Sequence, residues 1–350
     1  MATDCDDESS SKEPETGSFP DNVKAYIQYG DTFTVLTGLL DAYGAVSDSR
    51  NSTLINSLFG VTLSPGTVKN MRQRCAEKIS PLMEMVKKSI IESEACHSDE
   101  TGVRVNGKLM WVHNSSTSEY TYQTISDKRG IEGIKENGVV PEFDGTSVHD
   151  CWNSYFIFDG VTHAICGAHI LRELAGIQDL EPCHVWPGHF VDLLIRMKSA
   201  KEKAQTENRS ELSEEELHRL RSRYDWVLEL ADTECPPLPE SPVKKRGRRK
   251  KGKERSLIER LRKLKNAVCC FVNDFKVPFD NNQAERDLRG IKTKSKVSGC
   301  FRSSEGARNY LTISSFLNTA KKNGVNVFRA LTSVFEGDVE FIQNPSSDSA

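Results

Sequence analysis

The pattern of apolar and polar positions divides the chain into a helical first part, a strand-rich centre and a mostly helical second half. Apolar residues recur at spacings of three and four through residues 22–91, which is the period of an amphipathic helix. One such segment ends at Gly60, and the next opens with Ser64 at the N-cap and Pro65 as the first helical residue. The stretch therefore predicts helix, turn, helix.

The charges on the second of these helices leave two interpretations open. Lys69, Arg72, Arg74 and Lys78 decorate it at helical spacing. A helix-turn-helix that lies in a DNA groove would use such cations. A packed helical hairpin with solvated charges explains them as well, and these residues alone favour it.

Residues 95–174 change to strand signals. Three apolar runs follow one another closely, and Asn106-Gly107 between the first two is a strong hairpin signal. The order is three antiparallel strands, a helix, a fourth strand and a segment that passes from strand into helix, within the ranges 103–105, 109–113, 120–125, 131–135, 146–149 and 163–174. This is the order of a ribonuclease-H-like sheet, so we expect a mixed α/β fold with that core.

The rest of the chain predicts helices around a break. A proline-rich stretch at 236–239 leads into residues 244–255, of which nine of twelve are Lys or Arg, and we interpret 236–255 as an exposed basic linker. We expect six parts: a disordered acidic tail (1–20), a helical DNA-binding region (21–92), the first part of the core (93–185), an all-helical insertion (186–270), the second part of the core with C-terminal helices (271–335) and a tail (336–350).

Composition adds limits on location and partners. The 47 basic and 50 acidic residues nearly balance, so the net charge of -3 does not by itself indicate nucleic acid. No apolar run approaches the roughly 20 residues that span a bilayer. The first twenty residues lack the basic start and apolar stretch of a secretory signal. We expect a cytoplasmic protein whose ten cysteines are reduced thiols or metal ligands.

Three acids stand out by their positions. Asp99, beside Glu100, lies at the first expected strand, Asp150 lies at the end of the fourth, and Glu285 follows Asp280-Asn281-Asn282. The first and fourth strands of a ribonuclease-H-like sheet are neighbours, so the two aspartates can converge. Clustered carboxylates suit hard divalent cations in phosphoryl transfer. Taken singly, ordinary roles are favoured: a turn residue, a helix N-cap, and a helix pair of Glu285 with Arg289.

Several separate blocks, in order, resemble the DDE transposases of the insertion sequence 66 family. They are His97-Ser-Asp-Glu-Thr-Gly-Val-Arg-Val, Val148-His-Asp150, His163-Ala-Ile-Cys-Gly-Ala-His-Ile-Leu-Arg-Glu-Leu174, Asp280-Asn-Asn-Gln-Ala-Glu-Arg-Asp-Leu-Arg289 and Lys296-Val-Ser-Gly-Cys-Phe-Arg302. The likeness runs from about residue 25 to 335. It implies that Asp99, Asp150 and Glu285 are the catalytic triad and hold two Mg²⁺ ions, for which Mn²⁺ can substitute.

The resemblance also implies the partners. A transposase of this kind cuts and joins double-stranded DNA at the terminal repeats and at the target. It commonly acts as a homodimer that bridges two ends. The resemblance therefore implies association with the nucleoid and no membrane partner. Because cations crowd behind the third acid, we expect DNA contacts there. The predicted DNA-binding residues are Lys69, Arg72, Arg286, Arg289, Lys292, Lys294, Lys296 and Arg302.

Two further features carry weaker predictions. His163, Cys166 and His169 form a short cluster that can bind zinc, but the favoured interpretation is a packed turn, since the Cys-x-x-His of related transposases looks architectural. Trp226 in the insertion is expected to be a buried core residue rather than a base-stacking one.

Two other function classes stay open. Members of the family typically carry an additional N-terminal region with coiled-coil and cysteine-rich parts, whereas this chain opens with an acidic segment. One alternative is therefore a truncated or catalytically inactive DNA-binding remnant or regulator. The other is a ribonuclease-H-like nuclease that does not join strands.

Overall fold

The structure is a computed structural model that describes residues 29–238 and 251–343. Over these residues it is a mixed α/β fold with 62% helix and one five-stranded sheet. The strands are β1 (Ala95–Val105), β2 (Lys108–Ser116), β3 (Thr121–Ser126), β4 (Thr146–His149) and β5 (Thr162–Ile165). The expected acidic tail and the last seven residues lie outside the described residues.

The sheet order is β3-β2-β1-β4-β5, with β1, β2 and β3 antiparallel and β4 and β5 parallel to β1. This arrangement is compatible with the expected ribonuclease-H-like core. Asn106, at a positive φ of 48°, and Gly107 form the hairpin between β1 and β2 as predicted, because a tight hairpin turn needs left-handed residues.

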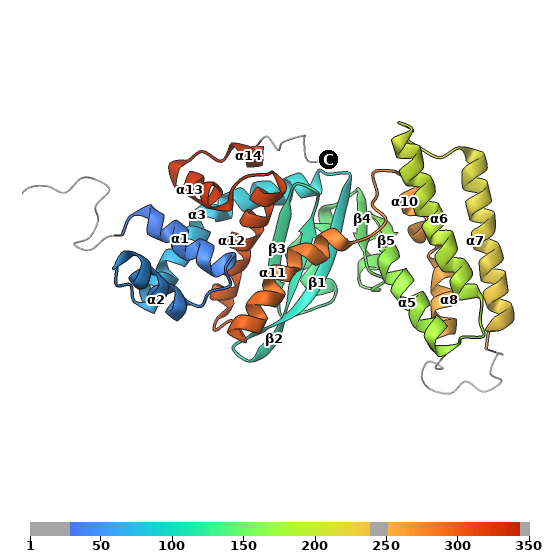
Figure 1. Cartoon of the computed structure of the whole chain (residues 1–350), viewed down its shortest axis with the longest axis horizontal. Helices are drawn as coiled ribbons and strands as arrows, with labels where there is room; N and C mark the ends of the chain where they lie inside the picture. The colour runs from blue at the N-terminus through green and yellow to red at the C-terminus, as the bar shows by residue number, and fades with distance from the viewer. Residues whose placement is uncertain (1–28, 239–250, 344–350) are drawn as a thin grey trace, which may run out of the picture.

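Helices surround the sheet and extend the molecule on both sides (Figure 1). Their bounds are α1 (Asp31–Ala42), α2 (Asp48–Phe59), α3 (Pro65–Ile91), α4 (Ile131–Asn137), α5 (Gly167–Leu180), α6 (Trp186–Thr206), α7 (Glu214–Glu234), α8 (Lys253–Lys263), α9 (Lys265–Val268), α10 (Cys270–Asn273), α11 (Asn282–Ser298), α12 (Ser304–Lys322), α13 (Val327–Glu336) and α14 (Glu340–Gln343), with short 3₁₀ helices η1 (Val140–Glu142) and η2 (Tyr155–Ile157). Among the described helices, none is long and apolar enough to cross a membrane.

The predicted helix, turn, helix is present as α2 and α3. The Ser64 hydroxyl accepts a hydrogen bond from the Thr67 amide, and Pro65 is the first residue of α3. Ile55, Leu63, Val68 and Met71 form a small hydrophobic cluster inside this hairpin. The sequence thus predicted the local geometry, which suits either interpretation of the cations on α3.

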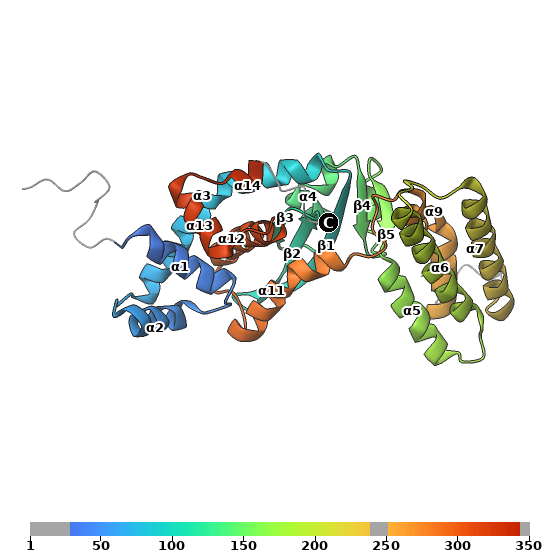
Figure 2. The ribbon, with the colours of Figure 1, turned by 45° about the horizontal axis from the view of Figure 1, so that its top comes forward.

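Two large hydrophobic clusters meet at the middle of the sheet. The first joins β1, β2 and β3 to α1, α3, α11, α12 and α13. The second joins β4 and β5 to α5–α10, the helices on the right of Figures 1 and 2. The boundary falls between β1 and β4. Polar groups at the ends of these two strands therefore lie at the boundary between the two hydrophobic cores.

The ends of two predicted segments need correction. Residues 253–255, expected in the exposed linker, begin α8 instead, and Arg255 is buried with its Nη1 2.6 Å from Asp232 Oδ1 and 2.9 Å from the Cys235 carbonyl. A basic side chain can thus be buried where carboxylate and carbonyl oxygens surround it. The expected tail after residue 335 contains α14, whose Ile342 is buried.

Candidate active site

The register of the sheet brings Asp99 and Asp150 together. The last pair between the parallel strands β1 and β4 joins His97 to Val148, and two further residues along each strand lead to the two aspartates. The Asp150 charge accordingly raises the pKa of Asp99. Oδ1 of Asp99 accepts a hydrogen bond from the Glu100 amide, and Oδ1 of Asp150 accepts one from the Trp152 amide, each 2.9 Å long.

The surroundings of Asp99 disfavour its ionised form and raise its pKa. Burial raises its pKa most, the charge of Glu100 raises it further, and the charge of Asp150 adds to both, so that the pKa reaches about 7. The hydrogen bond from the Glu100 amide and the cation of Lys292 lower the pKa of Asp99, and the amide has a larger effect than the Asp150 charge. A bound cation would relieve this crowding, since it favours the ionised form.

Asn281 fixes the start of α11 against β1. Its side chain donates to the Ser98 carbonyl (2.7 Å) and accepts from His97 Nδ1 (2.9 Å), while its amide donates to Cys166 Sγ (3.2 Å). Asn281 is buried. The first turn of α11, which carries Glu285, is therefore held beside the strand that carries Asp99 (Figure 2).

The Glu285 carboxylate is paired with α5. Its Oε1 lies 3.0 Å from Arg172 Nη2 and 3.8 Å from His169 Nε2. Within residues 29–238 and 251–343, no three His, Cys, Asp or Glu side chains are grouped closely enough to hold a metal ion. The structure thus couples the two aspartates and places Glu285 on the neighbouring helix, where an arginine holds it.

Cations form a line along the exposed face of α11. Arg289, Lys292 and Lys296 follow Glu285 at spacings of four, three and four residues, so they share one face of the helix. These three side chains are exposed, as are Arg286 in the first turn and Arg302 beyond the helix. We call Arg289, Lys292 and Lys296 the α11 stripe. It leads away from the third acid.

Lys294 must be removed from the predicted DNA contacts. It is buried, and its ammonium donates to Asp41 Oδ1 at 2.5 Å and to the Val46 carbonyl at 3.1 Å. The helical period explains the error, because Lys294 lies on the inner face with Ile291. Its role is to connect α11 to α1.

Arg72 is corrected in the same way, whereas Lys69 faces solvent. Arg72 has only 11% of its side chain exposed, and Nη1 lies 2.5 Å from Asp48 and 3.4 Å from Asp41. Lys69 is 46% exposed and 3.8 Å from Glu305. Of the two predicted contacts on α3, only Lys69 remains available to a phosphate.

The three residues of the possible zinc site have separate partners. His163 Nδ1 shares a hydrogen bond with His149 Nε2 at 2.9 Å, Cys166 accepts the Asn281 amide, and His169 lies beside Glu285. Burial lowers the pKa of His163. These contacts favour the packed-turn interpretation.

Sequence reasoning missed three residues that shape the site: Arg172, Asn281 and Arg129, which pairs with Glu100. Trp226 is corrected as well, since it is 41% exposed with the Arg223 guanidinium 3.8 Å from its ring centroid. The Asn281 contact with β1 spans 183 residues of sequence. A lone polar residue carries no local signal for such a contact.

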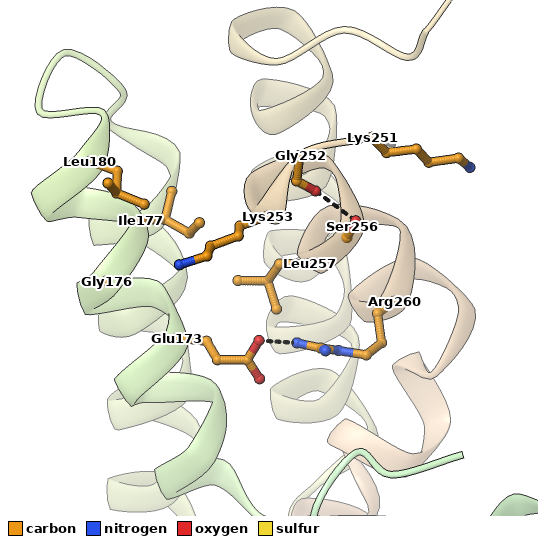
Figure 3. Close-up of a pocket in the computed structure, with 10 residues that line it drawn as sticks. All are labelled: Glu173, Gly176, Ile177, Leu180, Lys251, Gly252, Lys253, Ser256, Leu257 and Arg260. Carbon is orange, nitrogen blue, oxygen red and sulfur yellow. Dashed lines mark hydrogen bonds and ion pairs between the residues drawn. The ribbon is translucent and has the colours of Figure 1, made fainter. Parts of the chain in front are cut away.

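A pocket of about 910 Å³ lies between α5 and α8 (Figure 3). Ile177, Leu180 and Leu257 supply apolar walls, and an ion pair between Glu173 and Arg260 crosses it. None of the predicted site residues lines this pocket. We therefore keep the ends of the inner strands β1 and β4 as the candidate active site.

Comparison with known proteins agrees with the sequence resemblance. The family model described as "Transposase IS66 family" matches residues 46–309, more than half of the 350 residues. The match includes all three acids, α2, α3 and the whole sheet. A search of curated proteins gave no match.

Proposed function

Because the chain belongs to the IS66 transposase family, we propose that it cleaves DNA at insertion-sequence ends and transfers the strands, with divalent metal ions. The single observation that carries the proposal is the coupling of Asp99 with Asp150 beside the helix that begins with Glu285. An isolated acid on a strand would have no such partners.

The donor set fits hard divalent cations. Asp99, Asp150 and Glu285 offer carboxylate oxygens, which Mg²⁺ and Mn²⁺ prefer. Oδ1 of each aspartate accepts a backbone amide, so we assign Oδ2 of each to the cation. When bound, two such ions activate an attacking oxygen and stabilise the leaving oxygen of a phosphodiester.

The chain's own residues hold and orient the reacting groups. Asn281 fixes the start of α11, and in this proposal Glu285 turns from Arg172 toward the aspartates when the cations bind. Loss of the Glu285–Arg172 ion pair costs little free energy, because partly exposed ion pairs contribute about 0–1 kcal/mol. Arg172, 60% exposed, is then free to bind a phosphate.

DNA would lie along the α11 stripe. Lys292 is close enough to Asp99 to lower its pKa, so a phosphate bound by the stripe lies near the acids. Such contacts position the backbone without reading sequence. Arg286, Arg302 and Lys69 are exposed and would extend this surface.

We propose a separate role for each predicted part of the chain. We assign DNA binding to 21–92, chemistry to 93–185 and 271–335, and a supporting role to the insertion at 186–270. We also propose that two copies bridge two ends. Light scattering of the chain with and without end DNA tests this, and one copy per bridged pair of ends would contradict it.

Cleavage of labelled end DNA tests the proposed chemistry. The full chain with Mg²⁺ or Mn²⁺ is compared with Asp99→Asn, Asp150→Asn and Glu285→Gln, and Asp159→Asn is the control because Asp159 is exposed and outside the triad. We expect cleaved and joined products that each triad variant abolishes and the control retains. Binding without cleavage would instead support a DNA-binding remnant, and cleavage without joining would support a nuclease.

A further inference from the structure

A second buried acid lies directly beside Asp99, on the opposite face of the sheet. Glu100 has only 2% of its side chain exposed. Its Oε1 accepts hydrogen bonds from Arg129 Nε (3.0 Å) and Nη2 (2.8 Å), and its Oε2 accepts one from the Tyr155 hydroxyl (2.8 Å). Both oxygens are thus occupied by side chains, which argues against Glu100 as a metal ligand.

The Arg129 guanidinium lies over two tryptophan rings. The Trp111 ring centroid lies 4.9 Å from its Cζ atom and the Trp152 ring centroid 4.4 Å from it. Cation–π contacts of this kind contribute about 0.5–1 kcal/mol each at exposed sites, and the two N–H groups that converge on Oε1 of Glu100 are charge-assisted hydrogen bonds that restrict the guanidinium further. Arg129 therefore joins β1, β2 and the segment after β4.

The same cluster contains the two backbone amides that hold the catalytic aspartates. The Glu100 amide donates to Asp99 Oδ1, and the Trp152 amide donates to Asp150 Oδ1. Glu100 and Trp152 both contact Arg129 through their side chains. Arg129 therefore connects these two amide donors, as Tyr155 also does through its hydroxyl on Glu100 and its ring against Trp152.

We propose that Arg129 is a positioning residue for the metal-binding carboxylates, acting through Glu100 and Trp152 from the opposite face of the sheet. The inference rests on the proposed function, because it assumes that Asp99 and Asp150 hold the cations. Arg129 itself does not touch substrate or metal. Its effect is to fix the direction of the two Oδ1 atoms and hence of the free Oδ2 atoms.

An ordinary surface ion pair is the competing explanation, because the Arg129 side chain is 44% exposed. Such a pair contributes little and can be removed without consequence. Glu100, however, is buried, and a buried carboxylate that loses its cation is costly. A solvated ion pair would also lack the two ring contacts, which come from β2 and from the segment after β4.

Removal of the guanidinium leaves a site of defined shape. In Arg129→Ala, the vacated space beside the Trp111 and Trp152 rings and the Glu100 carboxylate is that of the lost planar guanidinium. Added ethylguanidinium would fill it, whereas ethylammonium has the charge but neither the planar shape nor the paired donors. Rescue by one and not the other separates positioning from a general loss of stability.

The experiment measures single-turnover cleavage of end DNA with Mn²⁺, Mn²⁺ binding by electron paramagnetic resonance, and DNA affinity. Loss of a side chain that orients metal ligands typically costs about 10- to 100-fold in metal affinity or activity, and we expect this for Arg129→Ala with DNA affinity unchanged. Ethylguanidinium should restore both quantities and ethylammonium neither. Arg129→Lys should fall between Arg129→Ala and the unaltered chain.

The control is Arg209→Ala. Arg209 is similarly exposed at 35% and binds two acids, Glu207 and Glu216, in the helical insertion. It should keep full cleavage and Mn²⁺ binding. A loss of equal size in Arg209→Ala would show a nonspecific effect of removing any paired arginine and would overturn the proposal.

Three other results overturn the inference. Full Mn²⁺ binding and cleavage in Arg129→Ala would show that Arg129 positions nothing, while the proposed function would stand. Lost activity without ethylguanidinium rescue, in both Arg129→Ala and Arg129→Lys, would show a purely structural role. If the unaltered chain neither binds Mn²⁺ nor cuts DNA, the proposed function fails and the inference fails with it.

Discussion

Replacement of Asp99 by asparagine should stabilise the chain at neutral pH when no divalent metal is present. The change removes a buried charge but keeps an Oδ1 atom to accept the Glu100 amide. Burial and the neighbouring charges raise the pKa of Asp99 from 3.8 to about 7. The ionised aspartate is therefore unfavourable in the folded state.

The magnitude follows from linkage between protonation and folding. A pKa difference of about three corresponds to about 4 kcal/mol, and partial solvent contact of the carboxylate reduces this to about 2 kcal/mol. The pKa of Asp99 is higher in the folded state than in the unfolded state. The contribution of protonated Asp99 to the free energy of unfolding is therefore fully present below pH 4 and is lost as the pH rises to about 7. Asp99→Asn should remove this part of the pH dependence.

Urea unfolding with EDTA, at a series of pH values from 4 to 8, measures the difference. We expect the two proteins to have similar free energies of unfolding at pH 4 and the variant to be about 2 kcal/mol more stable at pH 8. Excess Mg²⁺ at pH 8 should then stabilise the unaltered chain, by about 2.7 kcal/mol at 100 times its Kd, and leave the variant unchanged.

Either of two results would refute this reasoning. A variant that is less stable than the unaltered chain at pH 8 would show that the ionised carboxylate stabilises the fold. A constant difference from pH 4 to pH 8 would show that Asp99 has an ordinary pKa and that Asp150 does not crowd it.

Two further predictions concern the cations of α11. Lys294→Met should destabilise the chain by about 1.5–3 kcal/mol in urea unfolding, because it removes a charged hydrogen-bond partner of the buried Asp41 and leaves Arg72, at 3.4 Å, as the remaining cation; a loss below about 1 kcal/mol would contradict the buried role. Replacement of Arg289, Lys292 and Lys296 by alanine should lower the slope of log Kd for DNA against log salt by about 3 in fluorescence anisotropy, and an unchanged slope would show that the α11 stripe faces only solvent.

The sheet was largely predictable because its signals are local. Asn106-Gly107 specifies a hairpin within two residues, and the alternating runs on both sides specify its strands. The parallel pairing of β4 with β1 then follows from the fold class, and it brings Asp150 next to Asp99. The helix start at Ser64 was predictable for the same reason, since a cap acts over three residues.

The errors concern contacts between distant segments. Lys294 and Arg72 have exposed-looking sequence contexts, yet Asp41 on α1 binds both of them. The partner of Glu285 is Arg172 on α5, 113 residues earlier, rather than Arg289 one turn away. Trp226 is exposed although tryptophan is usually well buried. Such pairings depend on tertiary packing, which spacing along one helix does not specify.

A structure of the chain bound to end DNA and Mn²⁺ tests the central claim most directly. The account predicts manganese anomalous signal between the carboxylates of Asp99, Asp150 and Glu285, with Arg172 turned away from Glu285. Manganese bound elsewhere, with Glu285 still paired to Arg172 and the scissile phosphate remote from both aspartates, would contradict it.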